Sequence, residues 1–410
     1  MLAKRFILFF VLGVSLSGCA TYEMKVAKAR SDIMAGKAGE AANFLEPLAT
    51  KEGDDQLVYL FEYGTALQLA EKYKESNDVF LKADKMSEVK DYHSLTRIAG
   101  SMLLSEGMVQ YKGEDYEKVM INALSAINYL MLNQPDEAAV EARRLNEKLN
   151  HYRNDAKKPW QQSALARYLS AMIWESAGRY DDAYIDYEEC YRLDPEISLL
   201  PGDLIRMSKK SRRTDAYEKW SKLFPTVKYV KEWDDSSYGE IVLIYQQGWG
   251  PVKRPNPQHF TFPMLFPTWS QTFRARLTVD GDVTADSEPV YNISQVSIKN
   301  FNDEMGSLIA RRIAGIATKA IVADQIRQRD KALGDIAYIA MRLSDQADTR
   351  HWSTLPESFQ IARIRAPAGK HKVKVDGIDR GRQLTGDFMD EKEVVVKPRK
   401  ITFLNWRSVR

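Results

Sequence analysis

The amino-acid sequence predicts a multidomain protein, in which an all-α domain of paired helices precedes an α+β domain with an antiparallel sheet. Residues 25–225 have a helical spacing of apolar positions and almost no strand pattern, whereas β-branched and aromatic residues alternate between turn residues from about residue 235. The chain has 410 residues, 44% of them hydrophobic, which is enough apolar material for two cores. We therefore expect the helical domain over 25–225 and the α+β domain over 235–410.

The chain begins with the pattern of a secretory signal that ends at a cysteine. Two cations, Lys4 and Arg5, precede the apolar run Phe6–Ser15, which is shorter than the roughly 20 residues of a permanent transmembrane helix. The next four residues, Leu16-Ser17-Gly18-Cys19, resemble the lipobox of bacterial lipoproteins. The resemblance implies cleavage before the cysteine, with acyl chains added to its thiol and to the new amino terminus.

This segment also predicts where the protein resides. We expect residues 1–18 to be the signal peptide and residues 19–24 to be the lipidated N-terminus, held on a membrane by more than one acyl chain. In the bacterial sorting pattern that the segment resembles, an Asp after the cysteine favours the inner membrane, and Ala20 stands there instead. The periplasmic face of the outer membrane is therefore predicted ahead of the inner membrane. An ordinary signal peptide that ends near a cysteine is the alternative.

The cysteine count and the charge balance exclude several classes of function. Only Cys19 and Cys190 are present, so a lipidated Cys19 leaves no intrachain disulfide and no thiolate cluster for zinc. The formal net charge is +3, from 59 basic and 56 acidic residues, without the basic stripe of a nucleic-acid-binding protein. The sequence therefore predicts no nucleic acid, metal or cofactor as a ligand, and Cys190 is interpreted as a packed core thiol.

The helical domain carries a recurring pattern of small and large residues. In its clearest copy, Gly178 separates two helices, Ala171 and Ala183 lie 12 residues apart, and Pro195 ends the second helix. These intervals resemble the tetratricopeptide repeat, in which small residues lie where two helices cross. Three other segments have all or part of the same spacing. They are Tyr63, Gly64, Leu67, Ser76, Phe80 and Ala83; Ala126, Tyr129, Ala138, Ala142 and Leu145; and Gly36, Ala41, Leu45 and Leu48.

The repeat pattern also nominates a surface for binding partners. Stacked helix pairs bury a continuous core and leave a curved face exposed. Tyr63, Tyr129, Arg143 and Arg144 are the candidates, the two arginines as contacts for an acidic partner. The alternative is that the tyrosines belong to the core and that the arginines are solvated or paired within the chain. Irregular spacing between the copies predicts inserted helices, among them a hairpin within residues 88–120.

The α+β domain is predicted from strand patterns around one long helix. Strands are expected at Val242–Tyr245, Gln271–Asp280, Val290–Ile298, Phe359–Ile364, His371–Val375, Val394–Lys397 and Ile401–Trp406. A helical insertion is expected over about 303–345, where Ile309, Ile313 and Ile316 share one stripe. Together these elements predict a sheet that resembles a small β-sandwich and carries a helical insertion.

Two short motifs in this domain carry the residue types of a functional site. The first places Lys253 in Gly248-x-x-Pro251-x-Lys253, just after a strand, where it can contact an anionic group. The second, Asp348-Thr349-Arg350-His351-Trp352, gathers an acid, a base, an imidazole and an indole. We favour a structural role for both, in which Asp348 pairs with Arg350 or with nearby backbone and Trp352 fills the core beneath a turn.

Several of these features together resemble a family of bacterial lipoproteins with tetratricopeptide-like repeats. The resemblance rests on the lipobox, on Asn133–Arg144 (NQPDEAAVEARR), on the Gly248-Pro251-Lys253 turn and on Asp348-Thr349-Arg350-x-Trp352-x-x-Leu355-Pro356. It implies an envelope location and a repeat fold, and it brings no activity or site residues. Members of that family occur beside other envelope lipoproteins, including ones that resemble penicillin-binding-protein activators, which suggests a role in envelope assembly.

No motif of an enzyme is apparent along the chain. The five histidines form neither H-x-x-x-H nor H-E-x-x-H, and there is no nucleophile elbow, Walker loop or nucleotide-binding glycine motif. We therefore expect a non-enzymatic, lipid-anchored periplasmic scaffold that binds protein partners in peptidoglycan assembly, secretion or polysaccharide export. The alternatives are a peptidoglycan- or glycan-processing enzyme with a cleft between its domains, and a chaperone or pilot for an outer-membrane complex.

Overall fold

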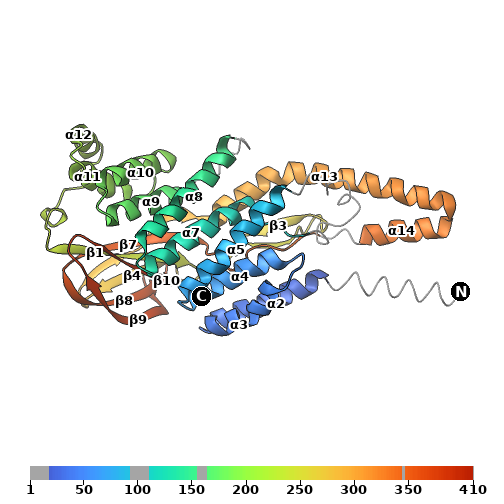
Figure 1. Cartoon of the computed structure of the whole chain (residues 1–410), viewed down its shortest axis with the longest axis horizontal. Coiled ribbons are helices and arrows are strands. Elements are labelled where there is room, and N and C mark those ends of the chain that lie inside the picture. Colours follow the sequence, from blue (N-terminus) through green and yellow to red (C-terminus); the bar gives the residue numbers. More distant parts are fainter. Residues whose placement is uncertain (1–17, 93–109, 155–163, 344–346, 410) are drawn as a thin grey trace.

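Helices that fold back on one another in antiparallel pairs form the first half of the molecule (Figure 1). The structure is a computed structural model that describes residues 18–92, 110–154, 164–343 and 347–409. The helices are α2 (Gly18–Met34), α3 (Ala38–Thr50), α4 (Gln56–Leu69), α5 (Tyr73–Tyr92), α7 (Asp115–Met131), α8 (Pro135–Asn154), α9 (Ala164–Ser176), α10 (Tyr180–Leu193), α11 (Leu200–Lys210) and α12 (Thr214–Leu223). Part of the hairpin predicted within 88–120 falls on 93–109, outside the described residues.

Small residues stand where the paired helices cross, as the repeat pattern predicts. A methyl group added to Gly64 of α4 would come within 2.6 Å of Cδ1 of Phe80 on α5, so glycine is needed for this approach. Ser76 closes the same crossing by donating from its hydroxyl to the carbonyl of Gly64 at 2.7 Å. Ala171 and Ala183, the matching pair in α9 and α10, are completely buried. The step of 12 residues therefore marks real helix crossings.

Two sheets and a small hairpin make up most of the second half. A 3-10 turn, η3 (Lys231–Trp233), precedes the strands β1 (Tyr238–Gln247), β2 (Val252–Pro255), β3 (Pro263–Phe266), β4 (Arg274–Val279), β5 (Val283–Asp286), β6 (Glu288–Asn292), β7 (Ser358–Pro367), β8 (Gly369–Ile378), β9 (Leu384–Val396) and β10 (Ile401–Arg407). The first sheet has the order β10-β1-β7-β6, and the second has the order β5-β4-β8-β9. Strands β2 and β3 form a separate two-stranded hairpin.

Strand β1 is buried on both faces because each face meets a different layer. Ile241 and Leu243 pack between the two sheets, in a core that also contains Leu277 and Val375. Val242 belongs instead to the large core shared with the helices. The strand therefore reads as a continuous apolar run and not as an alternating one.

The first sheet is mixed, which corrects the expectation of a purely antiparallel sheet. Strand β10 runs parallel to β1, with Glu240 opposite Ile401, whereas β1 and β7 are antiparallel. The reason is a crossing between layers: the chain leaves β9 in the second sheet, turns at Lys397–Lys400 beside the start of β1, and continues in the direction of β1. Nothing in the local sequence pattern specifies this direction.

The helical insertion is longer than predicted and forms a hairpin. Helix α13 (Ile293–Arg329) begins ten residues before the expected position, and α14 (Lys331–Leu343) returns beside it. The strand predicted over Val290–Ile298 is therefore wrong beyond Asn292, because the side chain of Asn292 accepts from the backbone amide of Gln295 at 2.9 Å and caps the helix there.

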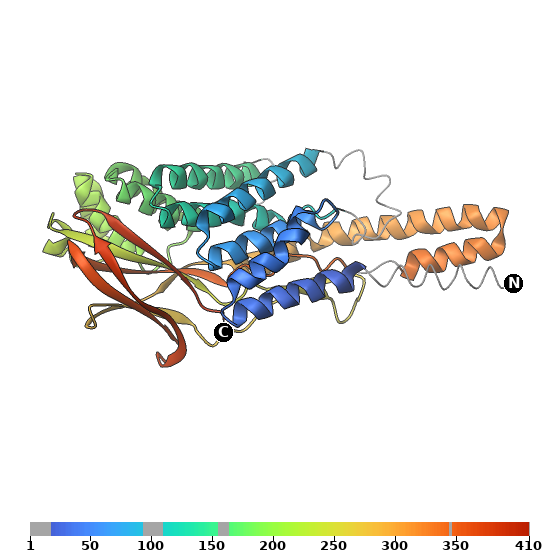
Figure 2. The same cartoon turned by 60° about the horizontal axis from the view of Figure 1, so that its bottom comes forward.

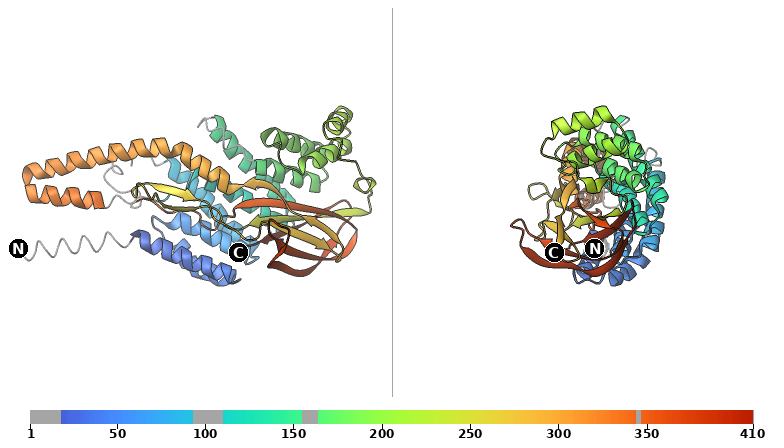
Figure 3. Two further views of the ribbon diagram at one scale, coloured as in Figure 1. Left: turned by 180° about the vertical axis from the view of Figure 1, so that it is seen from behind. Right: turned by 90° about the vertical axis from the view of Figure 1, so that its left-hand side faces the viewer.

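The helices curve around one side of the sheets, as the end-on view in Figure 3 shows. The α13–α14 hairpin projects from one end of the molecule, the end toward which the start of α2 also points, and α11 and α12 lie at the opposite end (Figures 1 and 2). Within the described ranges, no helix has both the length and the apolar composition needed to cross a membrane.

Candidate functional site: the junction of helices and sheets

The motif that most resembles an active site in sequence lies inside the helical layer. Trp352 is 2% exposed and stacks on Phe61 of α4, with ring centroids 4.5 Å apart, while Phe80 of α5 lies 5.6 Å away. The indole nitrogen donates to the hydroxyl of Thr65 at 2.9 Å. Trp352 is thus an aromatic anchor by which the segment 347–357 is inserted between α4 and α5.

Two buried glutamates of the helices hold the backbone of this segment. The amide of Trp352 donates to Glu117 of α7 at 2.6 Å, and the amide of Ser353 donates to Glu62 of α4 at 2.8 Å. Burial raises the pKa of Glu117 to about 7, with a further contribution from Glu114, and burial also raises the pKa of Glu62. These carboxylates are acceptors enclosed within the protein.

Asp348, Arg350 and His351 are engaged in contacts within the chain. Both oxygens of Asp348 accept from the guanidinium of Arg350, which also donates to Asp55 of the helical half at 2.9 Å. His351 is 6% exposed, its Nδ1 lies 2.8 Å from the carbonyl of Thr349, and burial lowers its pKa to about 3. The imidazole is therefore neutral at physiological pH, and the arrangement favours the structural interpretation of this motif.

The structure brings the two sequence motifs together. Lys253, at the start of the β2–β3 hairpin, is 5% exposed and places Nζ 2.5 Å from Glu114 and 3.4 Å from the carbonyl of Arg350. Burial alone would lower the pKa of Lys253, but the carboxylate of Glu114 raises it overall. Lys253 of β2 therefore contacts both the start of α7 and the segment 347–357, and the carboxylate of Glu114 balances its charge.

A second buried cluster, made of charged side chains, connects the first sheet to α9 and α11. Arg363 of β7 donates to Glu240 of β1 at 2.6 and 3.0 Å, to Glu175 of α9 at 2.9 Å and to Asp203 of α11 at 2.9 Å. Arg206 of α11 donates to Glu175 at 2.9 Å and to Asp203 at 2.7 Å. Three carboxylates and two guanidinium groups are thus paired where α9, α11, β1 and β7 meet.

Two of the three carboxylates in this cluster are held in their ionised forms, whereas burial raises the pKa of the third, Asp203, despite Arg363 and Arg206. Burial alone would raise the pKa of Glu175, but Arg206 and Arg363 hold it at about 2. The pKa of Glu240 is also lowered, since Arg363 and Arg206 outweigh the effect of burial. Sequence reasoning missed these residues because each stands in an ordinary helix or strand pattern, and only the fold brings them together.

The residues nominated for partner binding occupy different environments. Tyr63 and Tyr129 are half-buried against the helical core, whereas Arg143 and Arg144 are exposed on α8. Arg144 pairs with Glu141 at 2.9 Å. The tyrosines therefore offer only part of their surface, and the arginines are open to solvent.

The two cysteines have different positions in the chain. Cys190 is fully buried and unpaired, with its sulfur 3.4 Å from the carbonyl of Ala164, as a packed core thiol would be. Cys19 lies in the first turn of α2, and its side chain is outside the described part of the structure. In the described part, no three His, Cys, Asp or Glu side chains are grouped so as to hold a metal ion.

Comparisons with known proteins find similarity only to solved structures, and at a low level. No protein-family model matches the chain, and no curated protein matches it. Among solved structures, MamA residues 41-end from Desulfovibrio magneticus RS-1 is 18% identical, with 50% of this chain and 91% of that chain covered at a TM-score of 0.33. A tetratricopeptide repeat protein from Parabacteroides merdae is 14% identical, with 52% and 82% covered at a TM-score of 0.24.

The fold assignment therefore rests on the geometry of this chain. Its helices form antiparallel pairs, and the small residues at their crossings are 12 positions apart, as with Gly64 and Ser76. The helical half is tetratricopeptide-like. Its inner side is lined by residues that bind the chain's own sheets and the segment 347–357, including Thr65, Glu117 and Glu175.

Proposed function

We propose that the protein is a non-enzymatic scaffold of the bacterial cell envelope, anchored through lipid at Cys19, that binds a protein partner on the outer face of its helical half. The observation that carries the proposal is the filled inner side of the helices. Stacked helix pairs commonly bind partners on a concave face, but here Trp352, Arg350 and Arg363 of the same chain occupy that position. A partner must therefore dock elsewhere.

Helix α8 offers a suitable outer face. Val140, Arg143, Arg144 and Glu147 recur at the spacing of one helix face and are all exposed, Val140 to 43%. Val140 supplies apolar area, and Arg143 has a guanidinium that can bind carboxylates in a bidentate manner. We infer that the partner presents an acidic segment to this face, in a complex that serves peptidoglycan assembly, secretion or polysaccharide export.

The glycan-processing alternative needs a general acid with a raised pKa. Two buried carboxylates, Glu175 and Glu240, do reach a cleft between the helices and the sheet. Arginines lower the pKa of both, so neither is suited to deliver a proton near neutral pH. This favours binding over catalysis at that cleft.

A charge reversal on α8 tests partner binding. Cross-linking in intact cells followed by mass spectrometry should identify a protein attached to the wild-type chain, and Arg143→Glu should reduce that product at least fivefold. Lys85→Glu is the matched control, because Lys85 is also exposed on a helix of the same half and makes the same change in charge. Equal loss in both variants, or no effect of Arg143→Glu, would refute docking at this face.

The anchor is tested by fractionation. Cys19→Ser should move the protein from the membrane fraction to the soluble periplasmic fraction, because the acylated thiol is removed. A Cys19→Ser protein that stays with the membrane would show a different means of attachment.

A further inference from the structure

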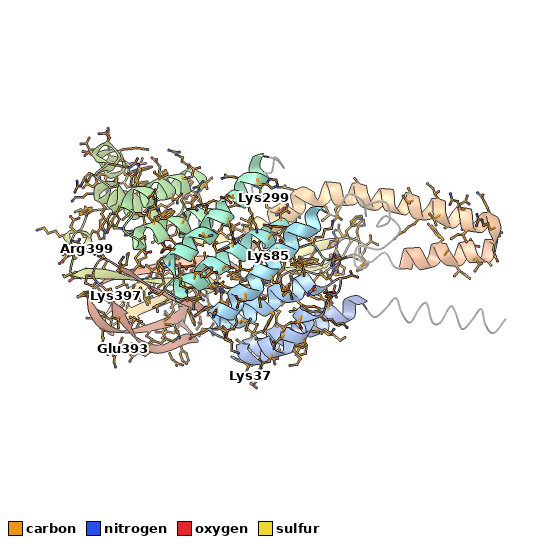
Figure 4. All side chains as sticks on the ribbon, viewed as in Figure 1. Lys37, Lys85, Lys299, Glu393, Lys397 and Arg399 are labelled. Atoms are coloured by element: carbon orange, nitrogen blue, oxygen red, sulfur yellow. The ribbon has the colours of Figure 1, made fainter. Side chains whose placement is uncertain are left out.

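A cleft of about 430 Å³ lies between the end of α11 and the sheets. Its walls come from the loop that contains η3, the start of β1, the end of β7 and the turn between β9 and β10. Arg399, labelled in Figure 4, stands on that turn at the end of the molecule where α11 and α12 lie. The cations that line the cleft are Lys209, Lys210, Arg212, Arg365, Arg399 and Lys400.

The acidic residues of the cleft are already paired. Glu175 and Glu240 accept from Arg363 in the buried cluster, and Asp234 lies 3.6 Å from Lys209 and accepts from the hydroxyl of Tyr229. Asp235 accepts from the backbone amide and the hydroxyl of Ser237.

Most of the cations of the cleft have no such partner. Within the described part of the chain, no carboxylate oxygen lies within 4 Å of the side-chain nitrogens of Lys210, Arg212, Arg365, Arg399 and Lys400. The cleft therefore holds an excess of positive charge that the protein itself does not neutralise.

Two of these cations are partly withdrawn from water. Nε of Arg365 is buried without any hydrogen-bond partner, although buried donors are nearly always paired. Lys210 is half-buried, and burial lowers its pKa to about 8 despite the nearby Glu175. A buried donor with no acceptor and a cation with a destabilised charge both favour an anionic ligand.

Backbone geometry supports the same conclusion at one position. Arg399 follows Pro398 with φ +57°, in the left-handed region that glycine adopts at lowest cost, and its side chain lines the cleft. Arg212 also has a positive φ, of +58°, but it stands in the turn after α11 where Glu71 and Asn133 stand after α4 and α7, so its backbone belongs to the repeat. A non-glycine residue in this region, such as Arg399, is commonly retained at a functional site.

We propose that this cleft binds a phosphate-bearing ligand with at least two negative charges. Guanidinium groups match phosphate oxygens in bidentate pairs, and five cations that no carboxylate of the described chain neutralises exceed what a single carboxylate can satisfy. The volume falls within the roughly 300 to 1,000 Å³ of small-molecule sites. Trp233 and Tyr180 also line the cleft and provide apolar surface for the rest of such a molecule.

The position of the cleft favours a soluble ligand over a lipid headgroup. Two of the elements that line it, the end of α11 and the turn between β9 and β10, lie at the end of the molecule away from the start of α2 (Figures 1 and 2). A chain attached at Cys19 would therefore hold the cleft away from its own membrane. The preference for a soluble ligand rests on the proposed anchor at Cys19. The proposed binding of phosphate in the cleft does not depend on that anchor.

Calorimetry with inorganic pyrophosphate tests the proposal on the full chain carrying Cys19→Ser. Arg365→Gln should weaken binding at least tenfold, because it removes a cation from the wall of the cleft. Arg399→Gly should weaken it at least threefold while leaving the melting temperature unchanged or higher, since glycine relieves the left-handed backbone. Asn133→Gly, at φ +56° far along the chain, and Lys85→Gln are the matched controls, and both should bind as the parent chain does.

The outcomes separate the two sources of a phosphate group. Binding of pyrophosphate but not of phosphatidylglycerol vesicles supports a soluble ligand, and vesicle binding that Arg365→Gln abolishes supports a lipid headgroup. The proposal is overturned if neither probe binds, or if Lys85→Gln weakens binding as much as Arg365→Gln. It is also overturned if Arg399→Gly lowers stability and leaves affinity unchanged, because Arg399 would then serve the fold alone.

Discussion

Replacing Trp352 with alanine tests whether the segment 347–357 holds the two halves of the protein together. Trp352 is 2% exposed and contacts Phe61 and Phe80, which belong to two different helices of the first half. A tryptophan of this kind buries about 150 to 250 Å². At about 25 cal/mol per Å² the lost transfer free energy is about 4 to 6 kcal/mol, and measured costs of Trp→Ala in cores are about 3 to 5 kcal/mol.

We therefore expect Trp352→Ala to lower the free energy of unfolding by about 4 kcal/mol. With a urea dependence of about 3 kcal/mol per M, the midpoint falls by about 1.3 M. Trp352→Phe keeps an aromatic ring beside Phe61 but loses the hydrogen bond to Thr65 and the buried volume of the second ring of the indole, so an intermediate cost of about 1 to 3 kcal/mol is expected.

The assay is urea unfolding of the Cys19→Ser chain, followed by near-ultraviolet circular dichroism. Trp269→Ala is the matched control, because Trp269 is 80% exposed and its removal should leave the midpoint unchanged. A shift below about 0.3 M in Trp352→Ala would refute the reasoning, since that is less than about 1 kcal/mol at the same urea dependence. Loss of a biochemical activity without such a shift would assign the motif to chemistry.

Three further predictions concern the helix crossing and the buried charges. Gly64→Ala should lower the free energy of unfolding by about 1 to 3 kcal/mol, because the added methyl group overlaps the ring of Phe80. Gly202→Ala is the control, since open space surrounds Gly202, and thermal unfolding should show no loss of stability for it. Burial raises the folded-state pKa of Glu117 to about 7 from an unfolded value near 4.5. Between these two values the folded state binds more protons than the unfolded state, so the stability that Glu117 contributes below pH 4.5 falls by about 3 kcal/mol as the pH rises to about 7. Glu117→Gln should flatten this decline, and urea unfolding measured from pH 4.5 to about 7 checks it. Arg363→Met should lower the free energy of unfolding by about 3 to 5 kcal/mol, since it leaves three buried carboxylates with one arginine, and unchanged thermal stability would contradict the cluster's role.

Local sequence patterns predict the helix pairs because each crossing is encoded by residues close together in the chain. The step from Gly64 to Ser76 and the turn at Gly178 are set by backbone geometry and by the size of one side chain. The change of pattern near residue 235 likewise marks the start of the strands at Tyr238. These features need no knowledge of distant contacts.

Long-range partners are what the sequence cannot reveal. The parallel pairing of β10 with β1 depends on where β9 ends in the other sheet. The early start of α13 depends on a cap at Asn292 that an alternating apolar pattern concealed. Arg350 and Arg363 look alike in a sequence, yet Arg350 has a partner, Asp55, 295 residues away, and Arg363 has partners up to 188 residues away.

The same limit applies to the candidate site. The Asp348–Trp352 motif stands out in the sequence by its cluster of residue types, but its role depends on Glu62 and Glu117, which look like ordinary helix residues. The cleft is built from single cations on α11, β7 and the β9–β10 turn. What distinguishes them is the positive φ of Arg399 and the unpaired Nε of Arg365, and a sequence reports neither a backbone angle nor a missing partner.

Site-specific photo-cross-linking in living cells tests the central claim most directly, namely that the chain fills the inner side of its own helices and binds partners on the outside. A photoreactive phenylalanine analogue at Arg143, exposed on α8, should yield adducts with a partner protein. The same analogue at Tyr59, which is 6% exposed and 5.7 Å from the ring of Tyr22, should react only within the chain. Partner adducts at Tyr59 and none at Arg143 would contradict the account.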